Sequence, residues 1–372
     1  MDSEIKATSV IVDLGSGVCK AGFGGDDAPR CTIPTLVGRP LHNQYIKLDR
    51  KSLYIGQEAQ SARGILKLQY PMEKGIVRSW DDMEAFMHNL FFNELRIIPE
   101  EHTFLLSEPP LSPKSNKERM AQVMFETFNC KALHVADQSV LTLYATGRTT
   151  GLVIDCGEGL TKVVPIYEGY AMPISINKTD LAGYELTSHM MRLLSKCGYS
   201  FGSSAEREIA RDLKERLCYV KKEMHNEDQA EERGYELPDG ETIAIGNERY
   251  ECSEMLFQPA LYGVEQLGIH ELVYDSINKC TVDLRRHLYS DLVLSGGSTL
   301  FPGFDERLLK EITNLAPNGM KIRMSTSPAS CRKYWAWLGG SIVSALTQFQ
   351  QMWVTKADYT EYGPSYMHRK CF

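Results

Sequence analysis

Two stretches of the chain combine an aspartate, two closely spaced glycines and a lysine, a set of residues suited to binding phosphate. The first consists of Asp13, Leu14, Gly15, Ser16 and Gly17, with Lys20 shortly after. Gly15 and Gly17 allow a tight turn whose backbone N–H groups can point at an anion. Ser16 adds a hydroxyl donor and Lys20 a positive charge. Because the Asp13 carboxylate repels a bare phosphate, its natural partner is a hydrated divalent cation that bridges to the phosphate.

The same pattern occurs again in the second half of the chain. It consists there of Asp155, Cys156, Gly157, Glu158 and Gly159, followed by Lys162. The separation is 142 residues both from Asp13 to Asp155 and from Lys20 to Lys162. An internal repeat on this scale predicts two similar domains, each presenting one such hairpin. Two hairpins that face each other would hold a phosphate chain from both sides.

A third glycine turn favours a nucleotide as the ligand. It follows the apolar strand predicted at Asp291–Leu294 and consists of Ser295, Gly296, Gly297, Ser298 and Thr299. Such glycines let a base or a ribose approach the backbone closely. Each turn alone could be an ordinary connection between strands. Three of them, two with an aspartate, favour a nucleotide cleft between two domains.

Strands and helices in alternation must position these turns. The apolar runs that end at Asp13 and Asp155 predict buried strands. Ser203 and Glu206 have the spacing of a capping box at the start of a helix. The region Tyr334–Trp353 is predicted to be helical, with a break at its two adjacent glycines. Strand–helix alternation in both halves indicates an α/β fold.

Composition narrows the classes of function. The chain has 372 residues and a net charge of −7, so it can build a sizeable core and has no electrostatic footprint for nucleic acid. Its ten cysteines include no C-x-x-C pair, which argues against a zinc site and is typical of reduced thiols. No apolar run approaches the length of a membrane span. We expect a soluble, intracellular protein that binds neither nucleic acid directly nor a membrane.

Longer stretches of the chain match a known family. They include CKAGFGGDDAPR, WDDME, LYATGRTTG, VPIYEGYAMP, DLAGYELT, VLSGGSTLFPG and the terminal HRKCF. On these stretches the chain resembles actin nearly end to end. The resemblance implies an actin-like ATPase fold of the α/β class, with two similar domains, each split into two subdomains, around a nucleotide cleft. The implied first domain covers residues 1–144 and 334–372, with a docking-loop subdomain at about 33–70, and the second covers 145–333, with an inserted subdomain at about 181–269.

The resemblance also implies ATP or ADP as the ligand, with Mg²⁺ or Ca²⁺. The positions that match the catalytic set are Asp13, Gln138, Asp155 and Lys162, of which Asp13, Gln138 and Asp155 reach the metal through water. The positions that match the phosphate loops are Leu14, Gly15, Ser16, Gly17, Lys20, Gly157, Glu158, Gly159, Leu160 and Thr161. Those that match the nucleoside pocket are Gly183, Lys214, Glu215, Gly296, Gly297, Ser298, Phe301 and Lys333.

Contacts with other proteins are implied in the same way. Residues 42–51, which include the apolar Tyr45, Ile46 and Leu48, match the loop that docks into the next subunit of a filament. Residues 261–269 match an apolar plug loop. A groove used by many actin-binding proteins is matched by Tyr144, Thr149, Ile342, Val343 and Leu346. The implied location is the cytoplasm and its cytoskeleton, with a nuclear or complex-bound protein as the alternative.

Several positions depart from conventional actins. Leu14 replaces an asparagine, Cys156 a serine and Glu158 an aspartate. Lys162 stands in place of a histidine near the attacking water, and Lys74 in place of a histidine that is methylated. A lysine stays charged near neutral pH, so Lys162 can donate a proton but cannot easily accept one. Two arrangements of Lys162 are open at this point, one facing the phosphates and one facing solvent.

Three functions are compatible with these residues. The first is a filament-forming cytoskeletal protein with slow ATPase activity, and the second is an actin-related structural subunit of a larger complex that binds ATP with little turnover. The third, a metabolic phosphotransferase on the same fold, needs a further base for a substrate hydroxyl, and the sequence offers no spare carboxylate beyond the metal set. Lys214 and Glu215 favour the first function, whereas Lys74 and Lys162 favour the second.

Overall fold

The computed structural model describes residues 8–41, 52–223, 230–325 and 331–371. The predicted docking loop at residues 42–51 lies outside them. The chain forms two compact units. Unit 1 contains residues 1–150, 166–173 and 333–372, and unit 2 contains residues 151–165 and 174–332. Residues 145–150, 166–173 and 333 therefore group with unit 1, although the sequence assigns them to the second domain.

A six-stranded sheet forms the centre of unit 1, in the order β18-β10-β9-β1-β2-β3. Its strands are β1 (Ser9–Leu14), β2 (Val18–Phe23), β3 (Cys31–Pro34), β9 (Thr103–Glu108), β10 (Ala132–Asp137) and β18 (Val354–Thr355). Strand β9 pairs in parallel with both β1 and β10. The carboxyl ends of these three strands therefore meet at one edge of the sheet.

Both faces of the central strands are buried, because β1 and β9 each contain consecutive apolar residues whose side chains point to the two faces in turn. Val10 and Val12 pack with the core that includes Phe86, under α2 (Trp80–His88) and α3 (Lys114–Gln122). Ile11 faces the other way, into a core with Leu141 and Trp337. These two residues come from α4 (Gln138–Ala145) and α11 (Trp335–Ser344). The result is a three-layer arrangement in which the central strands are inaccessible to solvent.

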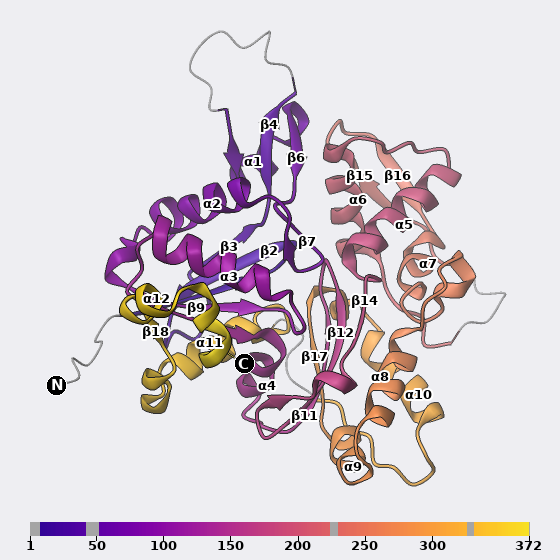
Figure 1. Cartoon of the computed structure of the whole chain (residues 1–372). Helices are drawn as coiled ribbons and strands as arrows, with labels where there is room; N and C mark the ends of the chain where they lie inside the picture. Colours follow the sequence, from indigo (N-terminus) through magenta and orange to yellow (C-terminus); the bar gives the residue numbers. More distant parts are fainter. Residues whose placement is uncertain (1–7, 42–51, 224–229, 326–330, 372) are drawn as a thin grey trace. The chain divides into compact units, whose positions relative to one another are not determined.

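Smaller elements complete unit 1. A three-stranded sheet has the order β5-β4-β6, from β5 (Tyr54–Ile55), β4 (Val37–Pro40) and β6 (Leu66–Gln69), and carries α1 (Gln57–Ser61) (Figure 1, indigo). A hairpin joins β7 (Met72–Glu73) to β8 (Ile76–Val77). Its two turn residues have positive φ, 51° at Lys74 and 73° at Gly75. The chain ends with α12 (Lys356–Tyr362) and α13 (Met367–Lys370).

Unit 2 is built on a sheet in the order β13-β12-β11-β17, with β14 paired to β12. The strands are β11 (Gly151–Cys156), β12 (Thr161–Tyr167), β13 (Tyr170–Ala171), β14 (Asn177–Thr179) and β17 (Leu292–Ser295), of which β13 and the end of β12 lie in segment 166–173. Its helices are α5 (Gly183–Lys196), α6 (Ser204–Leu217), α7 (Glu248–Glu254), α8 (Ile269–Lys279), α9 (Val282–Ser290) and α10 (Phe304–Leu315). A separate hairpin pairs β15 (Arg233–Glu236) with β16 (Thr242–Ile245). The alternation of strands and helices confirms the predicted α/β class.

The capping box predicted before α6 is present, since Ser203 and Glu206 bond each other's backbone N–H groups. The predicted break at Gly339 and Gly340 is wrong, because α11 runs through both. A Cβ atom at Gly339 would lie 1.8 Å from the carbonyl oxygen of Leu141. These glycines therefore let α11 approach α4 closely rather than end the helix. Among the described residues, no helix is long and apolar enough to cross a membrane.

We predict that Gly339→Ala destabilises unit 1. The added methyl group meets the backbone of α4, which cannot move aside as a flexible side chain can, and overpacking of this kind costs about 1–3 kcal/mol. The free energy of unfolding, measured by urea denaturation, checks this. Gly64→Ala is the control because a Cβ atom there has no neighbour within 4 Å. Equal stability of the two variants would contradict the close contact.

Candidate functional site

The first glycine turn lies between β1 and β2 in unit 1. A Cβ atom at Gly15 would lie 2.5 Å from the carbonyl oxygen of Val18, so the tight turn requires glycine there. Thr35 holds the turn with two hydrogen bonds. Its hydroxyl donates to the Gly15 carbonyl oxygen at 2.7 Å, and its backbone N–H donates to the Gly17 carbonyl oxygen at 3.1 Å. Ser16 accepts a hydrogen bond from the N–H of Gly75 at 2.9 Å. The hairpin is thus fixed to its surroundings on two sides, and the Ser16 hydroxyl keeps its own hydrogen for donation.

Asp13 is the charged centre of this turn. It is only 3% exposed, and a buried carboxylate is stable only when it is paired. Lys20 lies opposite Asp13 in the β1–β2 register, and its Nζ atom is 2.8 Å from Oδ2 of Asp13. The spacing of Asp13 and Lys20 in the sequence therefore corresponds to a cross-strand ion pair.

Gln138 and Ser107 complete the polar cluster around Asp13. Gln138 is the first residue of α4, whose N-terminus is capped by the carboxylate of Asp137. Its Nε2 atom lies 3.1 Å from both Oδ1 of Asp13 and Oγ of Ser107. Oγ of Ser107 is 2.5 Å from the same Asp13 oxygen. The structure thus brings Asp13, Lys20 and Gln138 together as the sequence suggests, and adds Ser107.

The second turn, in unit 2, repeats this ion pair. Nζ of Lys162 lies 2.8 Å from Oδ2 of Asp155, the same separation as in the first hairpin. Lys162 is 4% exposed. The alternative in which Lys162 points to solvent is therefore wrong. The repeated residues have the same pairing as well as the same spacing.

The residue after each aspartate belongs to the interior of its unit. Leu14 is 2% exposed and lies in the core beneath α2 and α3. Cys156 is fully buried, and burial raises the pKa of its thiol to about 12. Side chains at these two positions pack inward, so only their backbone can face a ligand. The side chains of Leu14 and Cys156 therefore do not form part of the turn surface.

Glycines of unit 2 bring three of its segments into contact: the second turn, the start of α5 and the third glycine turn. A Cβ atom at Gly183, the first residue of α5, would lie 2.3 Å from Oε2 of Glu158. At Gly296, which has a φ of 88°, a Cβ atom would lie 2.2 Å from the carbonyl oxygen of Cys156. The hydroxyl of Ser298 donates to the Gly157 carbonyl at 3.1 Å. Residues that are far apart in the sequence therefore form one compact cluster.

Lys214 fastens this cluster from α6. It is 2% exposed, and its Nζ atom donates to the Gly183 carbonyl at 2.8 Å and to the Thr187 hydroxyl at 2.9 Å. Nζ also lies 3.7 Å from Oε2 of Glu158. Burial alone would raise the pKa of Glu158, but Lys214 and two arginines, Arg207 and Arg211, hold it below its ordinary value. Glu158 is therefore ionised at neutral pH.

The remaining predicted residues have varied surroundings. Thr161 uses its hydroxyl inside unit 2, where it donates to the Leu181 carbonyl at 2.6 Å. Phe301 is buried, Glu215 pairs with Arg211 on α6, and Leu160 closes the second turn by accepting from the Gly157 N–H. Gly159 lies in the second glycine turn and Gly297 in the third. Lys333 is exposed and is the first residue of the last segment of unit 1.

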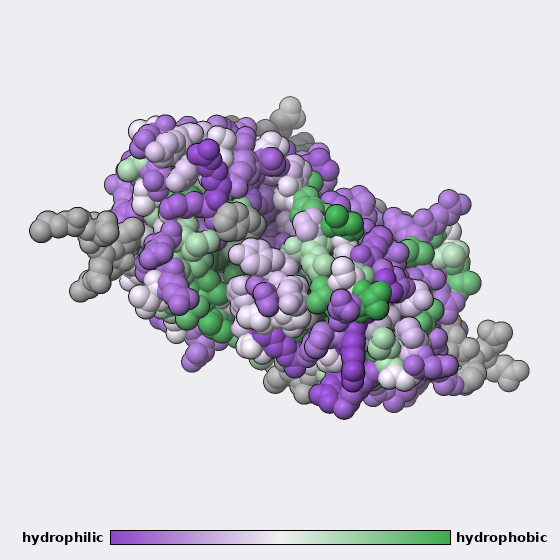
Figure 2. All heavy atoms as spheres, turned by 60° about the horizontal axis from the view of Figure 1, so that its bottom comes forward, coloured by the Kyte–Doolittle hydropathy of each residue, from purple (hydrophilic) through white to green (hydrophobic). Residues whose placement is uncertain are grey.

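The predicted partner groove falls on an apolar part of unit 1. Ile342 and Leu346 are 42% and 51% exposed. The ring of Tyr144 lies against Gly169, where a Cβ atom would be 2.2 Å from its hydroxyl. Figure 2 shows one face of the molecule, on which apolar side chains interrupt the hydrophilic surface.

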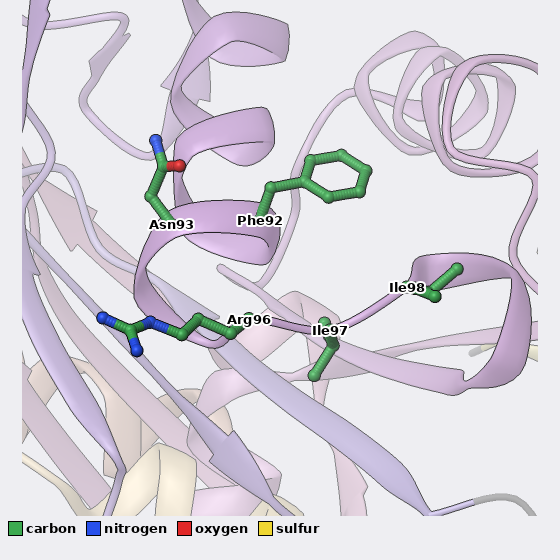
Figure 3. A pocket seen from close by; sticks show the side chains of 5 residues that line it. All are labelled: Phe92, Asn93, Arg96, Ile97 and Ile98. Atoms are coloured by element: carbon green, nitrogen blue, oxygen red, sulfur yellow. The ribbon is translucent and has the colours of Figure 1, made fainter.

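A separate open hollow lies elsewhere on unit 1. It has a volume of about 560 Å³ and is lined by Phe92, Asn93, Arg96, Ile97 and Ile98 (Figure 3). None of the predicted site residues lines it. In the described ranges no group of three or more His, Cys, Asp or Glu side chains is placed to hold a metal ion directly.

The fold and the comparison with known families agree. The mixed α/β architecture, with a repeated hairpin in each unit, is that of the actin-like ATPases. A family model described as Actin matches residues 4–372, and the chain therefore belongs to the actin family. Members of this family generally bind a nucleotide with a divalent cation, self-associate and bind partner proteins.

We predict that Lys214→Met destabilises unit 2 by about 1.5–3 kcal/mol at pH 7, the range for hydrogen bonds that involve a charged group. Because the pKa of Glu158 is lowered in the folded state, its contribution is present above the ordinary value of 4.5 and is lost as the pH falls through the folded value. The gap in unfolding free energy between wild type and Lys214→Met should therefore shrink on acidification from pH 7.

Urea denaturation at several pH values measures this gap. Arg216→Met is the control, since the Arg216–Asp212 pair is largely exposed on the same helix and such pairs contribute little. A gap that is independent of pH would mean that Lys214 does not act on Glu158.

Proposed function

We propose that this protein is an ATP-binding cytoskeletal member of the actin family that assembles head to tail into filaments and hydrolyses ATP slowly with Mg²⁺. The observation that carries the proposal is the repeated buried ion pair, Asp13–Lys20 in one hairpin and Asp155–Lys162 in the other, each at 2.8 Å. At each glycine turn, the carboxylate can accept a hydrogen bond from a metal-bound water, and the ammonium can donate one to a phosphate oxygen.

The donors present fit a hydrated divalent cation. Asp13, Asp155 and Gln138 supply oxygen atoms, which Mg²⁺ and Ca²⁺ prefer. Both carboxylate oxygens of Asp13 already accept hydrogen bonds from the protein, which suits contact through metal-bound water rather than direct ligation. The metal, when bound, would neutralise charge on the phosphates, and ATP or ADP would supply those phosphates.

The chain's own residues support slow rather than fast cleavage. Gln138 can orient a water but cannot take its proton. Lys162 is buried beside Asp155, where it can stabilise charge on the terminal phosphate as a donor. A histidine at this position could accept a proton near neutral pH, whereas a charged lysine cannot. ATP binding and ATP cleavage should therefore be separable in this protein.

The second candidate function is a structural subunit of a larger complex that binds ATP with little turnover or polymerisation. Lys162 favours it, as does Lys74 at a position with φ of 51°. Under either function, we propose that partners bind the groove formed by Tyr144, Thr149, Ile342 and Leu346. We propose a cytoplasmic, cytoskeletal location for the filament-forming protein, and a nuclear or complex-bound one for the alternative.

Sedimentation of the purified protein with Mg²⁺ and ATP, with phosphate release measured in the same samples, tests the proposal. We expect a pellet above a critical concentration and phosphate release that accompanies it. Chelating the metal should also lower the melting temperature, because a ligand at a hundredfold excess over its dissociation constant stabilises the folded state by about 2.7 kcal/mol. Bound ATP without a pellet or phosphate release would support the second candidate, and absence of bound nucleotide would contradict both.

Exchanging Lys162 tests its role in cleavage. We predict that Lys162→His releases phosphate in a single turnover about tenfold faster or more, since a positioned general base contributes about 10²–10⁴ in rate. Lys162→Arg is the matched control, because it keeps the charge beside Asp155 without gaining a proton acceptor. An unchanged or slower histidine variant would mean that Lys162 is a bystander or the catalytic group itself.

A further inference from the structure

We propose that Ser107 is a positioning residue that holds the Gln138 amide in place against Asp13, an inference that rests on the proposed ATPase function. Asp13, Ser107 and Gln138 are 3%, 6% and 9% exposed. Their polar atoms form a closed triangle with sides of 2.5, 3.1 and 3.1 Å. A buried triangle of this kind constrains which atom donates and which accepts at each corner.

The constraint begins at the carboxylate. Ionised Asp13 can only accept hydrogen bonds, so the single hydroxyl hydrogen of Ser107 points to its Oδ1 atom. Towards Gln138, the Ser107 oxygen is then an acceptor. The group of Gln138 that faces both oxygens must therefore be the NH₂ group. The carbonyl oxygen of Leu14, 3.5 Å from Nε2, adds a third acceptor on the same side.

The amide oxygen of Gln138 consequently lies on the opposite side of the amide from this cluster. From there it can accept a hydrogen bond from a water molecule, whereas a reversed amide would present two N–H groups. Attack on a phosphate requires a water whose oxygen lone pair is directed at phosphorus and whose hydrogens are held by acceptors. Asp13 and the Leu14 carbonyl, which can only accept, already select the NH₂ group for the buried side. We infer that Ser107, which bridges Asp13 and this NH₂ group, keeps the amide and its acceptor oxygen from shifting.

The position of Ser107 follows from strand pairing. In the parallel β1–β9 ladder, Val12 pairs with Leu106, so Asp13 and Ser107 are the next pair along. In unit 2 the corresponding partner of Asp155 is Ser295. Oγ of Ser295 donates instead to the Arg332 carbonyl, at 3.4 Å. The repeat therefore places a serine beside each aspartate. Within the described ranges, Ser107 forms a triangle with an amide, whereas Ser295 bonds a backbone carbonyl.

The test compares Ser107→Ala with Ser107→Thr, which keeps the hydroxyl. Ser139→Ala is the matched control: Ser139 follows Gln138 on α4, is 1% exposed, and its hydroxyl has no hydrogen-bond partner among the described residues. For each variant, the affinity for Mg-ATP is measured with a fluorescent ATP analogue, single-turnover phosphate release is measured under assembly conditions, and thermal melting reports folding.

We expect Ser107→Ala to lower the cleavage rate about tenfold or more while the dissociation constant for Mg-ATP changes by less than about threefold, because Lys20 still pairs with Asp13. Ser107→Thr and Ser139→Ala should cleave at the wild-type rate. Wild-type cleavage by a folded Ser107→Ala variant would overturn the inference alone, as would a Ser107→Thr variant that is folded but as slow as Ser107→Ala. A wild-type protein that binds no ATP, or binds it without cleavage, would overturn the proposed ATPase function and this inference with it.

Discussion

The buried pairing of an aspartate with a lysine across a glycine turn is the constraint on which both units depend. Water cannot stabilise Asp13 or Lys162, which are 3% and 4% exposed, so each needs an oppositely charged neighbour. Adjacent strands supply that neighbour. Because the pair forms only if the turn is tight, the glycines, the strand register and the charges are determined together. The same requirement in both units explains why the repeat preserves residue types as well as spacing.

Close backbone packing is the second requirement that the structure satisfies. Gly183 and Gly296 lie where a Cβ atom would overlap Glu158 and the Cys156 backbone, respectively. Lys214 then holds the assembled turns from α6. Residues that only pack or form ion pairs thus support the turns of the proposed site. Leu14 and Cys156 belong to this supporting set, because their side chains are buried.

The sequence alone predicts the repeat and the α/β class, because both are visible as local patterns of residue types. It predicts neither ion pair: the two lysines are expected to face phosphates, and for Lys162 a direction towards solvent stays open until the structure places it beside Asp155. It does not identify Ser107, which meets Asp13 only through the pairing of β1 with β9, 94 residues apart. The only feature of the sequence that points to Ser107 is a polar residue near the end of a buried strand. The sequence wrongly predicts a break of the helical region at the adjacent glycines 339 and 340, because the contact with Leu141 that explains them comes from a distant segment. Contacts between distant segments therefore determine the position of Ser107 and the course of α11, which local sequence patterns do not predict.

A crystal structure with Mg²⁺ and a non-hydrolysable ATP analogue tests the central claim most directly. The account predicts that the phosphates lie between the two glycine turns, with Nζ of Lys20 and of Lys162 at about 2.7–2.9 Å from phosphate oxygens. It also predicts that Asp13 and Asp155 reach the metal through water. A nucleotide bound away from these turns, or a Lys162 side chain directed away from the phosphates, would contradict it.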